Sequence, residues 1–87
     1  MQEQFSTVQV RNAKALLLDL CNDINATSFG DRSNLEHMCD IIIMRVRAAR
    51  LPELFTDELI TIINRRTVAA LLEAVILLED EIKEAER

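Results

Sequence analysis

The sequence predicts an all-α chain of three helices that assembles as a helical homo-oligomer. The 87 residues include one glycine and one proline, which leaves little material for the tight turns of a sheet protein. Three segments each combine a helix-start signal with apolar residues at helical spacing. A run near the C-terminus is apolar on all sides, and such a run needs cover from several neighbours.

The first helix is expected at about residues 7–25. Ser6 and Gln9 have the spacing of a capping box, in which each side chain bonds to the backbone N–H of the other residue. Apolar residues then recur every three or four positions and form one stripe: Val10, Ala13, Leu17, Leu20 and Ile24. A loop follows at residues 25–32, where Gly30 is the one residue that adopts positive φ without a Cβ penalty.

The second helix is expected at about residues 34–50. Ser33 and Glu36 repeat the capping-box spacing at its start. One face carries its core residues: Leu35, Met38, Ile42, Val46 and Ala49. Pro52 disfavours helical backbone angles at the residue before it, so the helix should end there.

The third helix is expected at about residues 57–86, and it is the longest of the three. Thr56 is the predicted N-cap, followed by two acidic residues in the first turn, where the helix dipole favours negative charge. No glycine or proline interrupts the segment before the end of the chain. A helix of about 30 residues would be roughly 45 Å long, more than two shorter helices could cover.

Self-association is predicted from residues 68–78, which read VAALLEAVILL. Glu73 is the only polar residue in this run, so the helix is apolar around its whole circumference. A chain of 87 residues has few other elements to surround it, and small domains bury a limited share of their surface. The missing cover is therefore assigned to a second copy, with five interface residues: Leu71, Leu72, Val75, Ile76 and Leu78.

Half of the ten basic residues lie between positions 45 and 66. They are all arginines: Arg45, Arg47, Arg50, Arg65 and Arg66. In an antiparallel hairpin, the last arginines of the second helix would bridge to Asp57 and Glu58, and the other pair would approach His37 and Asp40. The second interpretation is a binding site for an acidic or phosphorylated ligand, since guanidinium groups match carboxylate and phosphate geometry.

Cys21 and Cys39 lie on apolar helix faces, so both are expected to be buried free thiols with a structural role. Neither has cysteine or histidine partners at ligand spacing, and His37 has no partner three or four residues away, so no metal site is predicted. No serine–histidine–aspartate set, phosphate-binding loop or paired carboxylate motif is present. The protein is therefore expected not to be an enzyme and to need no cofactor.

The net charge of −5 and a pI near 4.8 disfavour nucleic acid as a partner. A helix-turn-helix is also disfavoured, because the segment TDELITIIN would place acidic and apolar residues where DNA contacts are needed. The N-terminal residues lack the pattern of a secretory signal, and the run at 68–78 is too short to cross a bilayer. We therefore expect a cytoplasmic protein without membrane contact.

These observations predict one helical domain over residues 1–87. Its expected function is that of a small non-enzymatic regulator, adaptor or inhibitor, which binds another protein while assembled as a homo-oligomer. One alternative is an oligomer that holds an anionic small molecule, such as a nucleotide, between its clustered arginines. A second alternative is a DNA-binding regulator.

Overall fold

The computed structural model describes residues 4–28 and 30–87. Over these residues the chain forms helices and no strands, which confirms the predicted all-α class. The helices are α1 (Thr7–Ala26), α2 (Arg32–Ala48), α3 (Glu53–Ile63) and α4 (Val68–Ala85). The prediction of three helices is therefore wrong, because the expected long third helix is divided into α3 and α4.

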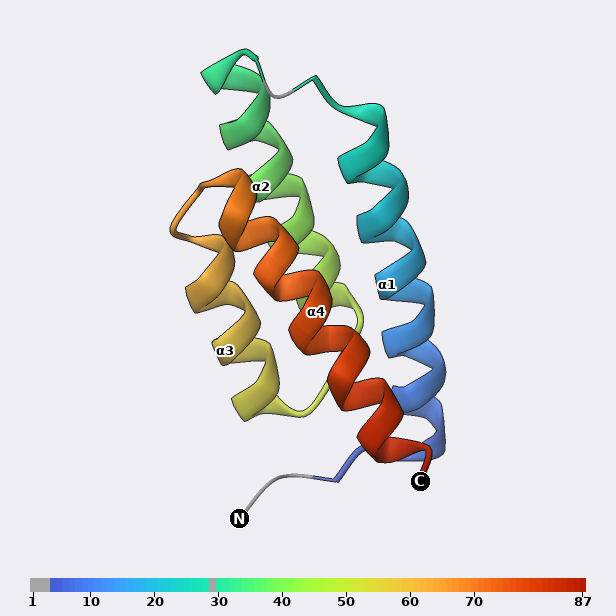
Figure 1. Ribbon diagram of the computed structural model, residues 1–87. Coiled ribbons are helices and arrows are strands. Elements are labelled where there is room, and N and C mark those ends of the chain that lie inside the picture. Colours follow the sequence, from blue (N-terminus) through green and yellow to red (C-terminus); the bar gives the residue numbers. More distant parts are fainter. Residues whose placement is uncertain (1–3, 29) are drawn as a thin grey trace.

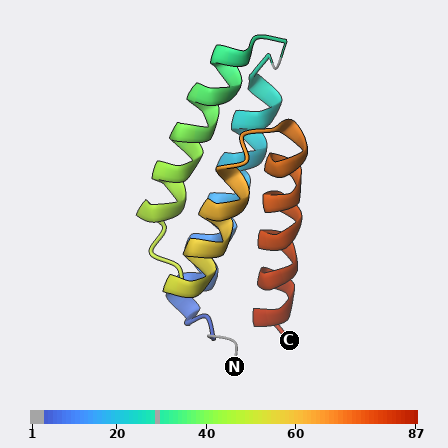
Figure 2. The same ribbon diagram turned by 90° about the vertical axis from the view of Figure 1, so that its left-hand side faces the viewer.

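The four helices form an up-and-down bundle, in which each helix runs antiparallel to the next (Figures 1 and 2). Each helix packs against the one that follows it, and α4 packs back on α1 to close the bundle. The chain enters and leaves at the same end of the molecule, which measures 39 × 21 × 20 Å (Figure 1). Because α3 has only 11 residues, the α3–α4 connection lies well short of the far ends of α1 and α2 (Figure 1).

One hydrophobic core joins all four helices. The largest fully buried aliphatic side chains come from every helix: Leu20, Ile42, Val46, Leu59, Ile63, Leu71 and Leu78. Phe5 also packs against this core, and its ring meets that of Phe55 edge-on, with 5.3 Å between the ring centroids. No polar or charged side chain among the described residues is buried, so the core is held by aliphatic packing.

The start of α1 is as predicted. The Gln9 backbone N–H donates to Ser6 Oγ at 3.1 Å, and the Ser6 N–H donates to Gln9 Oε1 at 2.9 Å, so the capping box is complete. The observed end at Ala26 lies within one residue of the expected boundary. This helix could be predicted well because its start signal and its apolar stripe are both local.

The start of α2 differs from the prediction. Asp31 is the N-cap, and its carboxylate accepts a hydrogen bond from the Ser33 N–H at 2.8 Å. The predicted capping box of Ser33 and Glu36 is wrong, since Glu36 instead lies 3.7 Å from the Arg32 guanidinium. Aspartate two positions earlier offers a charged acceptor to the same orphan N–H groups, and the helix gains residues at its start.

Positive φ also falls at other positions than expected. Gly30 does not adopt it, whereas Arg50 has φ 54° and Arg66 has φ 56°. Arg50 lies just after the end of α2, and Arg66 lies just after the end of α3. A left-handed residue at such a position turns the chain away from the helix axis, and glycine usually takes this role.

The largest correction concerns the predicted helix over residues 57–86. Its first part begins at Glu53, directly after Pro52, and Thr56 lies within α3, where its hydroxyl donates to the Leu51 carbonyl at 3.3 Å. The predicted N-cap at Thr56 is therefore wrong. Proline suits this start, because the first N–H groups of a helix have no helical partner.

The chain then reverses between Asn64 and Thr67. Thr67 is the N-cap of α4, and its hydroxyl accepts a hydrogen bond from the Ala70 N–H at 3.0 Å. The reversal lets α3 cover one side of α4, so apolar residues that one straight helix would leave exposed are buried within the chain. Burial of this area favours two helices over one long helix.

Candidate interaction surface

Helix α4 has one buried side and one exposed apolar side. Its buried residues face α1 and α3: Ala70, Leu71, Ala74, Leu78 and Ile82. On the outer side, Val68, Leu72 and Ile76 are 37%, 49% and 59% exposed. Residues four apart lie one above another on a helix, so these three form a continuous row, here called the α4 strip.

The five residues predicted at an oligomer interface are divided between these two sides. Leu71 and Leu78 are 1% and 0% exposed and belong to the core of the chain itself. Val75 is half-buried and packs against that core. Leu72 and Ile76 remain available to a partner. The run at 68–78 thus receives more cover from its own chain than three helices would have supplied.

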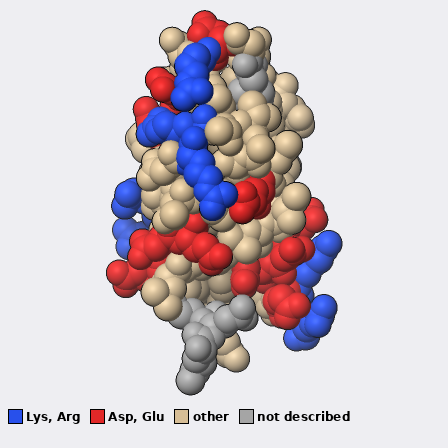
Figure 3. Space-filling model, turned by 60° about the vertical axis from the view of Figure 1, so that its left-hand side comes forward, with Lys and Arg blue, Asp and Glu red and all other residues tan. Residues whose placement is uncertain are grey.

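Charges differ between the two ends of the α4 strip. Arg65 and Arg66 lie just before α4, whereas Glu79 and Asp80 follow the strip by three and four residues, about one turn. Figure 3 shows one row of basic side chains over the upper part of this face and a band of acidic side chains below it, with further basic side chains at the lower edges. The charge of the surface around α4 therefore changes along the bundle axis, from basic before the helix to acidic in its second half.

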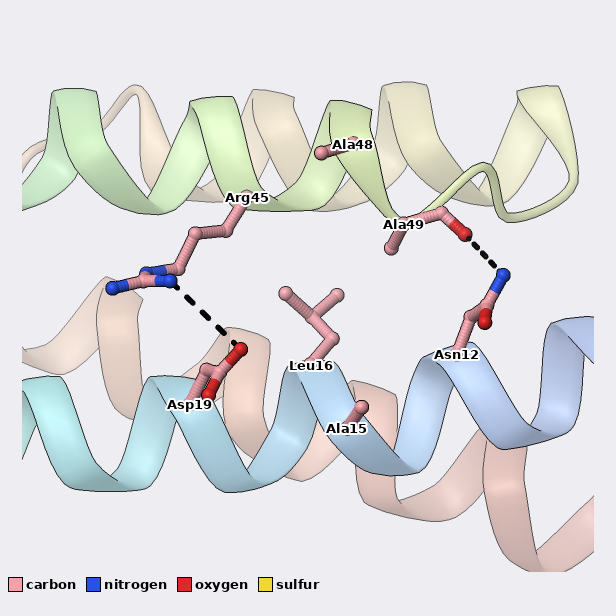
Figure 4. A pocket seen from close by; sticks show the side chains of 7 residues that line it. All are labelled: Asn12, Ala15, Leu16, Asp19, Arg45, Ala48 and Ala49. Carbon is pink, nitrogen blue, oxygen red and sulfur yellow. Dashed lines mark hydrogen bonds and ion pairs between the residues drawn. The ribbon is translucent and has the colours of Figure 1, made fainter.

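The arginines predicted as a site do not form one cluster. Arg45 turns towards α1, where its Nε lies 2.7 Å from Asp23 Oδ2 and one terminal nitrogen lies 3.8 Å from Asp19 Oδ2 (Figure 4 shows the second pair). Asp19 and Asp23 are four apart on α1, so their shared face was visible in the sequence. The sequence did not show that α1 would lie beside Arg45.

Arg66 pairs with Asp40 at 2.7 Å, which confirms that part of the predicted salt bridging. Arg65 instead lies 3.0 Å from Glu73, because the break before α4 turns it back towards that helix. Among the described residues, no ion pair joins Arg47 or Arg50 to Asp57 or Glu58. The predicted pairing at that end of the hairpin is therefore wrong.

Among the residues that the structure describes, three titratable groups have shifted pKa values. The hydrogen bond to Asp40 raises the pKa of Arg66. Burial raises the pKa of the Cys39 thiol, an effect that the nearby Arg66 charge partly offsets, so this cysteine stays protonated and unreactive. Burial, with a smaller contribution from the Glu58 charge, also raises the pKa of Glu81.

The two cysteines have different environments. Cys39 is fully buried, as predicted, whereas Cys21 is only half-buried. Both are free thiols, in agreement with the prediction. His37 is exposed on α2, the position expected for a surface histidine.

Two open hollows lie along α1. The first, of about 260 Å³, is lined by α1 and α2 residues: Asn12, Ala15, Leu16, Asp19, Arg45, Ala48 and Ala49 (Figure 4). Its polar groups bond to one another, since the Asn12 amide donates to the Ala49 carbonyl at 3.0 Å. The second, of about 430 Å³, lies between α1 and α4, and the Lys14–Glu86 ion pair at 2.8 Å crosses its lining.

Within the described part of the chain, no group of three or more histidine, cysteine, aspartate or glutamate side chains is placed to hold a metal ion. None of the helices formed by residues 4–28 and 30–87 has the length and apolar character needed to cross a membrane. Comparisons with protein-family models, curated proteins and solved structures found no match to this chain.

Proposed function

We propose that this protein is a small non-enzymatic binding protein that associates with itself through the α4 strip. In this assembled form it acts in the cytoplasm as a regulator, adaptor or inhibitor of another protein. The observation that supports the proposal is the exposure of Leu72 and Ile76 in line with Val68. Single exposed apolar residues are common on soluble proteins, whereas an aligned row on one helix is typical of a helix–helix contact.

The strip can supply useful but limited association energy. Full burial of a leucine or isoleucine side chain contributes roughly 1.5–3 kcal/mol, and these side chains are already about half covered. A stable interface normally buries about 800 Å² on each partner, which is more than three side chains provide. The neighbouring surfaces of α1 and α3 must therefore contribute, and we expect a dimer that dissociates on dilution.

Substitution on the strip tests the proposal. The double variant Leu72→Lys/Ile76→Lys should leave the chain folded, because both positions are exposed, and should shift sedimentation towards the monomer. Met44→Lys is the matched control, since Met44 is 70% exposed on α2, which lies diagonally across the bundle from α4. Equal association in both variants and in the unmodified chain would remove the strip from the proposal.

A second candidate function is binding of an anionic small molecule by arginines. The row of basic side chains in Figure 3 favours it, although Arg65 and Arg66 already pair with carboxylates. Nucleotides and inorganic phosphate should then raise the melting temperature of the protein by mass action. The rise should disappear in Arg65→Ala/Arg66→Ala. No shift with any of these anions would contradict this candidate.

A further inference from the structure

We propose that a second copy of this chain docks on the α4 strip in an antiparallel arrangement, related by a twofold axis that passes close to Leu72. The inference rests on the proposed function and adds the direction and register of the contact. Two features of α4 carry it: the even spacing of its apolar row and the opposite charges at its two ends.

The spacing of the row gives the register. Leu72 lies four residues after Val68 and four residues before Ile76. In an antiparallel pair with twofold symmetry, each residue before the axis in one copy meets a residue of the other copy that lies the same number of positions after the axis. With the axis at Leu72, the two copies of Leu72 meet each other, and Val68 meets Ile76 of the second copy. Every residue of the strip then has an apolar neighbour.

The charges give the direction. A parallel pair would bring Glu79 and Asp80 of one copy against the same residues of the other, and Arg65 against Arg65. The antiparallel pair instead brings the two arginines just before α4 near the acidic second half of α4 in the second copy. Like charges in contact are unfavourable, and complementary charges fix orientation more than they add affinity.

One particular pair follows from the register. Arg65 lies three residues before the start of α4, and Asp80 lies four residues after Ile76, so with the axis at Leu72 Arg65 and Asp80 of the second copy lie at the same end of the contact. Arg65 already reaches Glu73 within its own chain, and Asp80 lies two turns after Glu73 on the same side of α4. The twofold axis keeps like sides of the two helices together, which makes Asp80 of the second copy the residue that Arg65 meets.

Glu73 must also be placed in this arrangement. It lies one residue from the axis, so the two copies of Glu73 come near each other on one side of the contact. Arg65 of each chain already lies 3.0 Å from its own Glu73 and offsets this repulsion. The Arg65 side chain is 58% exposed, and therefore free to exchange between Glu73 and Asp80 of the second copy.

Disulfide cross-linking tests the register directly. In the full chain carrying Cys21→Ala/Cys39→Ala, single cysteines are introduced at the strip and oxidised at a concentration where the protein is associated. Leu72→Cys should form a covalent dimer. Val68→Cys and Ile76→Cys should each form no covalent dimer alone and should cross-link to each other when mixed. A parallel contact would instead cross-link each of the three variants with itself.

Charge exchange tests the direction in a chain that keeps both native cysteines. Arg65→Glu and Asp80→Arg should each weaken self-association about five- to tenfold, the effect expected for two symmetric exposed ion pairs. The double variant Arg65→Glu/Asp80→Arg should restore self-association. Arg47→Glu is the control of equal charge change on α2, and it should leave association unchanged.

The outcomes separate this inference from the proposed function. Association that persists with cross-links of the parallel pattern, or without rescue by charge exchange, overturns the antiparallel arrangement and leaves self-association standing. A chain that stays monomeric in sedimentation, with no cross-link at any of the three positions, overturns both.

Discussion

Leu78 and Ile76 lie two residues apart on α4, yet their side chains are 0% and 59% exposed. Leu78→Ala should lower the free energy of unfolding by about 2–5 kcal/mol, because it leaves a cavity in the core. Ile76→Ala should change the unfolding of the dissociated chain by less than about 0.5 kcal/mol, the usual range for surface positions. Denaturant unfolding at low protein concentration measures both. Similar losses of unfolding free energy in the two variants would contradict the placement of Leu78 on the buried side of α4 and Ile76 on the exposed side.

Glu81 provides a pH-dependent test. Its pKa in the folded chain is raised above the ordinary value of 4.5, first by burial and then by the Glu58 charge. A carboxyl whose folded pKa is raised stabilises the fold in its neutral form, and that contribution is lost as pH rises through the raised pKa. Glu81→Gln should therefore raise the melting temperature at neutral pH and have little effect below about pH 4.5.

Glu58→Gln provides the comparison for this test. It removes only the second cause of the shift, so its stabilising effect at neutral pH should be smaller than that of Glu81→Gln. A melting temperature that falls in Glu81→Gln at neutral pH would show that the ionised carboxylate stabilises the fold.

At the scale of the helices, the residue that ends α2 offers a test of backbone conformation. Arg50 has φ 54°, a conformation that costs an L-residue roughly 1–2 kcal/mol and costs glycine little. Arg50→Gly should raise the free energy of unfolding by up to about 1 kcal/mol, after allowance for the greater freedom of glycine in the unfolded chain. Arg50→Ala keeps the Cβ atom and should show no such gain.

The hydrogen bonds at this helix end should survive that substitution. The Asn12 amide donates to the Ala49 carbonyl at 3.0 Å, and the Gln9 amide donates to the Arg50 carbonyl at 3.3 Å. Both bonds end on backbone oxygens, so the Arg50 side chain is not needed for them. If Arg50→Gly is no more stable than Arg50→Ala, the positive φ of Arg50 does not carry the expected cost.

The helices that the sequence predicted best are those with local start signals. The capping box at Ser6 marks α1, whereas the break between α3 and α4 is marked only by Thr67, with no glycine or proline nearby. Arginine disfavours positive φ, so the turn at Arg66 could not be expected from residue type. The break exists because folding back buries apolar area, and that gain depends on tertiary contacts.

The candidate surface could be predicted only in part for a related reason. Residues 68–78 are apolar around the whole helix, so their spacing does not show which side faces the core. The positions of α1 and α3 decide that Leu71 and Leu78 are buried and that Leu72 and Ile76 are exposed. The arginines could be recognised as a group in sequence, but their partners depend on which helices lie side by side.

At the scale of the whole molecule, the bundle is closed by contact between its first and last helices and leaves an aligned apolar row on the outer side of α4. Helix α4 closes the bundle by packing on α1 through the apolar core, and the exposed Lys14–Glu86 ion pair lies where the end of α4 meets α1. In a closed four-helix bundle each helix has an outer side that no other helix covers. On α4 that side carries Val68, Leu72 and Ile76, which is why self-association is the central proposal.

The molar mass in solution tests this proposal most directly. Sedimentation equilibrium of the unmodified chain over the micromolar range should give a mass above the 9.9 kDa of one chain, rising with concentration towards that of a dimer. The variant Leu72→Lys/Ile76→Lys should remain folded with a mass of one chain. A folded, unmodified chain that stays at 9.9 kDa throughout this range would contradict the proposal.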